Sequence, residues 1–135
     1  MTDLTQQGFT LCSPLKGFSA LAGPYYEKHE NQVITRAFVI EDKHLNPEGV
    51  THGGALLSFA DYIIYRAIGD EVGHILKFAT INLNNNFVSA AKAGDIVYGT
   101  GKVVRKARDV IFGEGQIFTE QKTIMHSSGI WKIIV

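Results

Sequence analysis

The sequence predicts an α+β fold in which an antiparallel β-sheet packs against one long helix. One stretch before residue 70 is long, apolar and free of proline, which is typical of a buried helix. The segments after it are rich in Val, Ile, Thr, Tyr and Phe and are joined by short breaks, as expected for consecutive antiparallel strands. All three prolines lie within the first 47 residues, so none interrupts a sheet in the rest of the chain.

Residues 1–30 are expected to form an irregular lead-in with a short helical turn near Ser19–Leu21. The β-branched segment 32–41 predicts a first strand, and the HLNPEG segment at 44–49 predicts a loop. Residues 53–69 are predicted to form the central helix. Four further strands are predicted at 75–90, 95–105, 110–119 and 123–135.

The predicted helix is apolar on nearly every side, whereas one sheet can cover only one of its faces. A second copy of the protein is the simplest cover for the other face, so we expect an obligate dimer. Gly69 and Gly73 offer positions at which the helix can end.

Size and composition place the whole chain, residues 1–135, in a single domain. Hydrophobic residues make up 45% of it and charged residues 19%, which excludes a disordered protein. Thirteen basic residues balance thirteen acidic ones, and this argues against a protein that binds nucleic acid. The single cysteine, Cys12, cannot form an internal disulfide. The sequence shows no signal peptide and no run long enough to span a membrane, so we expect a cytoplasmic protein without a membrane partner.

Most standard catalytic motifs are absent. The five histidines include no pair at helical i, i+4 spacing, which argues against a metal site. The stretch Gly99-Thr100-Gly101-Lys102 matches a phosphate-binding loop only in part and is better explained as easing a bend in a strand. Ser58 lies within the helix rather than on a Gly-x-Ser-x-Gly elbow, which argues against a serine triad.

The junction between loop and helix is the first candidate for chemistry. The first backbone N–H groups of a helix lack partners within the helix and carry the positive end of its dipole. Gly53 and Gly54 would let a carbonyl oxygen approach these groups closely, where a developing negative charge is stabilised. The alternative is that both glycines only allow a tight turn into the helix.

Asp61, in the middle of the predicted helix, is the second candidate. Its neighbours are apolar, so it either faces a solvated cleft or is tuned to act as a general base. Ser58 and Tyr65 fall on the same side, so a narrow polar stripe is an equally open explanation. His52 and Asp61 are nine residues apart, or about 13 Å along a helix axis. Two antiparallel helices across a dimer could bring Asp61 of one chain to the helix start of the other.

The run from His44 to Asp61 resembles the signature of the hotdog-fold acyl-CoA thioesterases of the PaaI-like, phenylacetate-pathway family. That family carries Asn-x-x-Gly-x-x-His-Gly-Gly, then seven residues, then Asp. The matching positions here are Asn46, Gly49, His52, Gly53, Gly54 and Asp61.

The resemblance implies a hotdog fold, with a five-stranded antiparallel sheet wrapped around the central helix. It implies a homodimer with a continuous sheet, commonly paired again as a homotetramer. The implied reaction is hydrolysis of an acyl-CoA thioester to a free acid and CoA, with no metal or redox cofactor.

The resemblance also implies roles for individual residues. The Gly53 N–H would polarise the thioester carbonyl, and Asp61 of the partner subunit would activate water as a general base, or act as a nucleophile. Asn46 and His52 would position the thioester or the water, and Thr80 would hold the water beside the aspartate. Substrate binding is assigned to Gly54 and Ser58, together with the basic cluster Arg105, Lys106 and Arg108 as candidates for the CoA phosphates.

The sequence leaves several alternatives open. The basic cluster is equally well explained as a solvated turn between strands. After Phe87 the family usually has Arg-Pro-Ala, whereas this chain reads Val-Ser-Ala, so the acyl group is not defined. The alternatives to hydrolysis are a non-catalytic module that binds acyl-CoA and a hotdog hydratase or dehydratase of enoyl thioesters.

Overall fold

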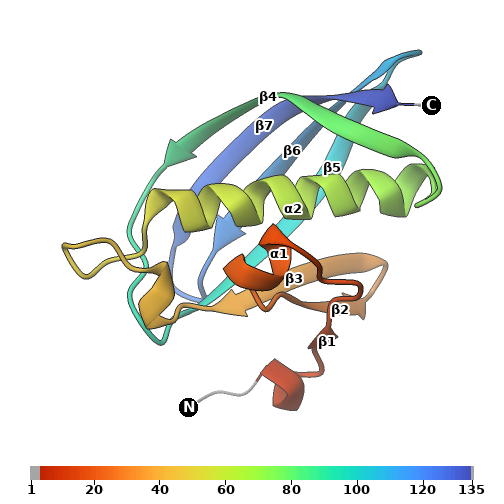
Figure 1. Ribbon diagram of the computed structural model, residues 1–135. Coiled ribbons are helices and arrows are strands. Elements are labelled where there is room, and N and C mark those ends of the chain that lie inside the picture. Colours follow the sequence, from red (N-terminus) through yellow and green to blue (C-terminus); the bar gives the residue numbers. More distant parts are fainter. Residues whose placement is uncertain (1–3, 135) are drawn as a thin grey trace.

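The computed structural model describes residues 4–134, in which helix α2 lies across one face of an antiparallel sheet (Figure 1). The helical elements are η1 (Leu4–Gln7), α1 (Phe18–Ala22), η2 (Asp42–His44) and α2 (Gly53–Val72). The strands are β1 (Thr10–Leu11), β2 (Tyr26–Glu30), β3 (Val33–Val39), β4 (Lys77–Phe87), β5 (Ile96–Lys106), β6 (Val110–Phe118) and β7 (Thr123–Ile134). Their order in the sheet is β1-β2-β3-β5-β6-β7-β4, and every neighbouring pair is antiparallel. The predicted fold class is confirmed.

Helix α2 begins at the predicted residue and ends at Val72 rather than at residue 69. His52 precedes it with an extended backbone and caps it, because its side chain accepts a hydrogen bond from the Gly54 N–H. Gly69 stays helical, and the helix stops before Gly73, whose φ of 99° favours glycine. Neither α2 nor any other helix of residues 4–134 combines the length and hydropathy needed to cross a membrane.

The helix lies very close to the sheet because glycines occupy the strands beneath it. A Cβ atom at Gly101 would lie 3.0 Å from the carbonyl oxygen of Ile63 and 3.3 Å from the Cα of Ile64. A Cβ at Gly113 or Gly115 would lie 2.7 or 3.0 Å from the Ile64 side chain. The glycines of β5 therefore make room for the helix, whereas the irregularity of β5 falls later, between Val103 and Arg105. The glycines of β5 are therefore explained by close packing against the helix and not, as predicted, by a bend in the strand.

The hydrophobic core fills the rest of the space between α2 and the sheet. Ile63, Ile64 and Phe59 of the helix are fully buried, as is Trp131 of β7. Tyr25, just before β2, joins this core, since its ring packs 5.2 Å from that of Phe59 between centroids. The lead-in thus covers part of the helix.

The lead-in is more regular than predicted. The predicted helical turn is present as α1, but residues before and after it form β1 and β2, so the sheet has seven strands rather than five. Strand β2 (YEKHE) is rich in charge and has no β-branched residue, so composition alone does not predict it. It forms because Asn31 and Gln32 adopt positive φ angles of 53° and 65° in a tight turn that pairs β2 with β3.

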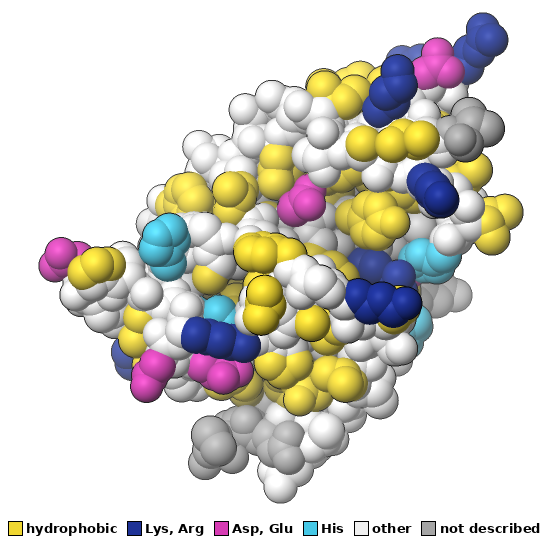
Figure 2. Space-filling view, viewed as in Figure 1, with side chains coloured by type: hydrophobic (Ala, Val, Ile, Leu, Met, Phe, Trp, Pro, Cys, Tyr) yellow, Lys and Arg dark blue, Asp and Glu magenta, His cyan; other side chains and the backbone are white. Residues whose placement is uncertain are grey.

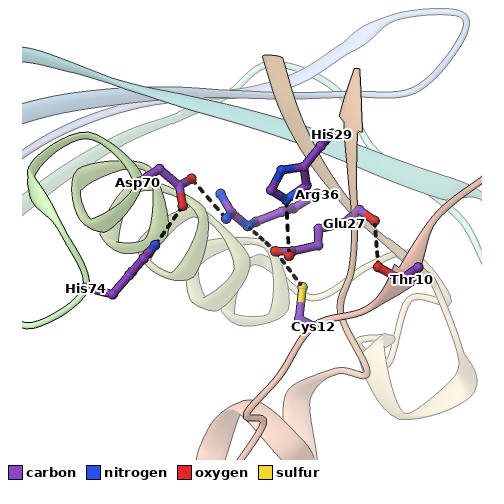
Figure 3. A network of polar contacts seen from close by, with 7 residues as sticks. All are labelled: Thr10, Cys12, Glu27, His29, Arg36, Asp70 and His74. Carbon is purple, nitrogen blue, oxygen red and sulfur yellow. Dashed lines mark hydrogen bonds and ion pairs between the residues drawn. The ribbon is translucent and has the colours of Figure 1, made fainter. Parts of the chain in front are cut away.

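A buried charge network ties these added strands to the end of α2 (Figure 3). The Arg36 guanidinium of β3, only 2% exposed, donates to Glu27 of β2 at 3.2 Å and to Asp70 of α2 at 3.0 Å. His29 contacts Glu27, and His74 contacts Asp70. Two carboxylates therefore compensate one buried guanidinium, an arrangement that stabilises only while both partners remain.

Cys12 and Glu27 show how this network affects ionisation. Burial raises the pKa of the Cys12 thiol to about 11, so it stays protonated and donates to Glu27. Burial also acts to raise the pKa of Glu27, but the Arg36 charge and the hydrogen bonds from its neighbours outweigh it, so that pKa lies below its ordinary value of 4.5.

We expect Gly101→Ala to lower the free energy of unfolding by about 1–3 kcal/mol, because the new methyl group meets backbone atoms of α2 that cannot move aside separately. Urea denaturation measures the change. Thr100→Val, on the opposite face of the same strand, is the control and should change stability by less than about 0.5 kcal/mol. Equal stability of the two variants would contradict the close packing described above.

Glu27→Gln is expected to destabilise the protein at pH 7 by about 1–3 kcal/mol, because it leaves the buried Arg36 with one carboxylate. A lowered carboxyl pKa contributes stability above about pH 4.5 that is lost as the pH falls through the lowered value. The variant should therefore lose less stability than the wild type on acidification. Urea titrations at pH 7 and pH 4 test this, with Glu30→Gln, an exposed ion-pair partner of Lys28, as the control.

Candidate active site

A pocket of about 600 Å³ lies against α2, between the lead-in and β4. Helix α2 contributes residues at the spacing of one helical face, and β4 contributes two more: Ser58, Asp61, Tyr62, Tyr65, Arg66, Phe78 and Thr80. The view of this side of the molecule shows hydrophobic side chains spread over the face, with an acidic side chain near its middle and basic side chains among them (Figure 2). The pocket thus combines aromatic walls with polar and charged side chains, Lys16, Asp61 and Arg66 among them.

Asp61 and Thr80 are brought together in this pocket. The Thr80 Oγ1 donates a hydrogen bond of 2.8 Å to the Asp61 Oδ1 and fixes the orientation of the carboxylate. Among residues 4–134, no hydrogen-bond donor meets the other oxygen, Oδ2, so it is available to a water molecule or a substrate. Ser58 lines the same pocket, although its hydroxyl donates back to the Gly54 carbonyl at 2.8 Å.

The start of α2 leaves one backbone donor open. The Gly54 N–H donates to the His52 Nδ1 at 2.7 Å, and the Ala55 N–H donates to the His52 carbonyl at 3.0 Å. Within the described part of the chain the Gly53 N–H has no acceptor. Because the His52 Nδ1 accepts, its Nε2 carries the ring proton and can donate to a ligand. The helix start thus offers two donors, Gly53 and His52.

Asn46 shapes the loop in front of this helix. Its Oδ1 accepts hydrogen bonds from the backbone of Glu48 at 2.9 Å and of Val50 at 3.3 Å. The loop is closed further by the Asn46 N–H, which donates to the Val50 carbonyl at 2.8 Å. No hydrogen bond joins the Asn46 side chain to His52 within residues 4–134, so what the structure shows for Asn46 is a role in the loop.

The helix start and Asp61 do not meet within one chain. The helix runs without a break from Gly53 through Asp61, so the two residues stay about 12 Å apart along its axis. Gly53, Gly54 and His52 accordingly do not line the pocket that contains Asp61.

The basic cluster also lies away from this pocket. Arg105 and Lys106 line a separate hollow with Glu71 and Val72, at the C-terminal end of α2. Arg108 follows them in the turn between β5 and β6. The assignment of this cluster to the CoA phosphates therefore stays a prediction.

From the sequence, Tyr25 could equally line an acyl pocket or pack in the core, whereas Tyr62 and Arg66 were not assigned to the site. Tyr25 and Tyr62 form part of the pocket wall, and burial raises the pKa of both well above the ordinary tyrosine value, so both remain neutral. Arg66 is the one arginine among the pocket residues. The helical spacing from Ser58 through Asp61 and Tyr62 to Arg66 could have indicated that these residues share a face.

Comparison with known proteins shows the family of this chain. A sequence profile described as "Thioesterase superfamily" matches residues 48–125, which is more than half of the chain and includes His52, Gly53, Asp61 and Thr80. This chain belongs to the thioesterase superfamily. Among curated proteins, no significant match to the sequence is found.

Solved structures show that this superfamily member has the hotdog fold. The BH2602 protein from Bacillus halodurans, solved with CoA, has a TM-score of 0.82 at 16% identity, covering 98% of this chain and 85% of that one. Zebra fish thioesterase superfamily member 2 has a TM-score of 0.77 at 23% identity, with coverage of 91% and 88%. The PaaI protein of E. coli, from the phenylacetic acid degradation operon, has a TM-score of 0.71 at 19% identity, with coverage of 99% and 86%. The fold predicted from the PaaI-like resemblance is confirmed.

Proposed function

We propose that this protein hydrolyses acyl-CoA thioesters, with Asp61 as the general base. The observation that carries the proposal is the Asp61 carboxylate, held by Thr80 at 2.8 Å inside a partly aromatic pocket, with its second oxygen open among the described residues. Membership of the thioesterase superfamily and the likeness to structures solved with CoA support the same reaction.

The proposed reaction is a water addition followed by loss of the thiolate. The free oxygen of Asp61 accepts a proton from water as the water oxygen bonds to the thioester carbon. The carbonyl oxygen becomes negative and accepts a hydrogen bond from a helix start. Collapse of this intermediate breaks the C–S bond, and the CoA thiolate takes up the proton, so that a free acid and CoA leave.

The helix start in this scheme belongs to a second subunit. Gly53 and Asp61 of one chain are separated by two turns of helix, so the donor opposite Asp61 is Gly53 of the partner subunit. The N–H of Gly53 and the Nε2–H of His52 are the two donors that this end of the helix presents. Each dimer thus contains two sites, and each site uses both chains.

The free edge of the sheet is the proposed route to the dimer. Among the described strands, β4 pairs only with β7, on one side, and it carries exposed hydrophobic side chains, with Ile81 and Phe87 both 56% exposed. Unpaired edge strands of this kind readily pair with another chain. Antiparallel pairing of β4 with its copy would extend the sheet and bring the two helices side by side, and further pairing of dimers would give the tetramer.

Asp61→Asn is expected to reduce kcat for acyl-CoA hydrolysis by about 10²–10⁴-fold, because the amide keeps the shape but cannot accept the proton. Release of free CoA, detected with a thiol reagent, measures the rate. Size-exclusion chromatography should show the same oligomer for the variant and the wild type. Glu120→Gln, in the turn after β6, is the control, and near-wild-type turnover by Asp61→Asn would remove Asp61 from the mechanism.

The CoA-release assay, together with the absorbance of an enoyl-CoA, separates hydrolysis from the two alternatives. A module that only binds acyl-CoA would release no CoA from any substrate. A hydratase would change the absorbance of an enoyl-CoA without releasing the thiol. We expect CoA release and no hydration.

A mixture of two inactive variants tests whether the site is shared. Gly53→Pro removes the open N–H at the first helical position, where proline is tolerated, and the extended backbone of His52 suits a following proline. It should lower kcat by about 10²–10³-fold. Co-expression with Asp61→Asn should restore about one quarter of wild-type activity, because half of the dimers are mixed and each holds one intact site.

Gly53→Ala is the matched control for this experiment. It adds the same Cβ, which would lie 3.3 Å from the exposed Phe87 ring, but keeps the N–H, so its activity should exceed that of Gly53→Pro by at least tenfold. If mixed dimers form and their activity is no higher than that of the parent variants, the site lies within one chain.

A further inference from the structure

Arg66 is a cation in the pocket that contains Asp61, and no carboxylate of residues 4–134 forms an ion pair with it. The geometry points to an acyl-CoA substrate whose acyl chain ends in a carboxylate, with the Arg66 guanidinium as the group that binds this distal carboxylate. The inference rests on the proposed hydrolase function and adds the class of acyl group.

The first line of support is the unsatisfied state of Arg66. Its Nε is buried and has no hydrogen-bond partner among the described residues. No carboxylate of residues 4–134 lies within ion-pair distance of its guanidinium. The contrast with Arg36 is clear, because that buried guanidinium is paired with both Glu27 and Asp70. A buried N–H of a charged side chain is costly without an acceptor, so the Arg66 Nε–H favours binding of a ligand that supplies one.

The second line of support is the surroundings of Arg66. The pocket side chains nearest in sequence are Tyr62 and Tyr65, and Tyr25 forms another part of the wall. Burial raises the pKa of Tyr25 and Tyr62, so neither becomes a phenolate that could neutralise the guanidinium. Asp61 is engaged by Thr80 rather than by Arg66. The negative charge of the Asp61 carboxylate lies in the same pocket, but the described residues give the Arg66 guanidinium no ion-pair partner, so the guanidinium donors are open to a ligand.

The third line of support is the placement of Arg66 relative to Asp61. The two residues are five positions apart on one helix, or about 7.5 Å along its axis, and both side chains line one pocket. An acyl chain whose thioester carbon lies at Asp61 can therefore extend along the helix towards Arg66. The aromatic walls suit the methylene groups, and the planar guanidinium suits a carboxylate through two parallel hydrogen bonds.

The CoA phosphates are a different possible ligand for the same cation. Lys16 also lines the pocket, so the pocket contains two positively charged side chains, Lys16 and Arg66. However, the buried Nε places part of the Arg66 guanidinium beneath the surface, where a short acyl group fits better than a bulky nucleotide. The two ligands are distinguished because CoA is common to every substrate, whereas the distal carboxylate is not.

The experiment compares kcat/KM for substrates matched in chain length: adipyl-CoA against hexanoyl-CoA, and glutaryl-CoA against pentanoyl-CoA. The wild type should prefer the carboxylate member of each pair by at least tenfold. Arg66→Gln should reduce this preference by about 10- to 100-fold, because it removes the charge-assisted hydrogen bonds. Arg66→Lys keeps the charge without the planar fork and should retain part of the preference.

Lys102→Gln is the control, since Lys102 lies on β5 with a side chain that is 72% exposed and paired with Glu114. It should leave the preference unchanged. Equal kcat/KM for both members of a pair in the wild type would overturn the inference, and so would an Arg66→Gln variant that slows both equally. In either case CoA release would continue, and the proposed hydrolase function would stand.

If the proposed hydrolase function is wrong, the experiment gives a different result. If the wild type releases CoA from none of these substrates, calorimetric titration with adipyl-CoA and hexanoyl-CoA replaces the rate measurement. Tighter binding of adipyl-CoA that is lost in Arg66→Gln would support the inference for a binding protein. Equal affinities would overturn it.

Discussion

The close approach of α2 to the sheet is the constraint on which the rest of the structure depends. The strands beneath the helix carry glycine where a side chain would meet the helix backbone, most directly at Gly101. This fixes the height of the helix above the sheet and buries Ile63 and Ile64 completely. It also decides which helical face remains for ligands, because the residues opposite the glycines, Asp61 and Tyr65 among them, face the pocket.

A single straight helix has a consequence for chemistry. Its start offers an open N–H at Gly53, and its middle carries the carboxylate of Asp61, but the rigid rod between them keeps the two groups apart. Bending the helix to join them would break the packing on the glycines. A site that needs both a carboxylate and a helix start is therefore most simply built from two antiparallel copies of the same helix, which links the proposed dimer to the proposed reaction.

Local patterns in the sequence predicted the central helix and the strands that follow it, because each of those elements buries its own apolar residues. They did not predict β2, since its pairing with β3 depends on a tight turn at Asn31 and on the distant partners of Arg36 and Glu27. The strand glycines were explained wrongly because their partner, the helix, is far away in sequence. The family resemblance, not any local pattern, implied that Thr80 lies near Asp61 and holds the water there, whereas the structure shows a direct hydrogen bond between the two side chains.

Arg66 was not assigned to the site from the sequence, because the burial and pairing of an arginine cannot be read from its residue type. A charged residue on an amphipathic helix is ordinarily solvated, so its type alone carries no information about function. What distinguishes Arg66 is the combination of a buried Nε with the absence of any carboxylate within ion-pair distance in the described chain. Arg36 is more deeply buried, yet its two carboxylates make it a structural element. The balance of charge around each guanidinium, rather than its depth, thus separates the arginine that holds the fold together from the one that is free to recognise a substrate.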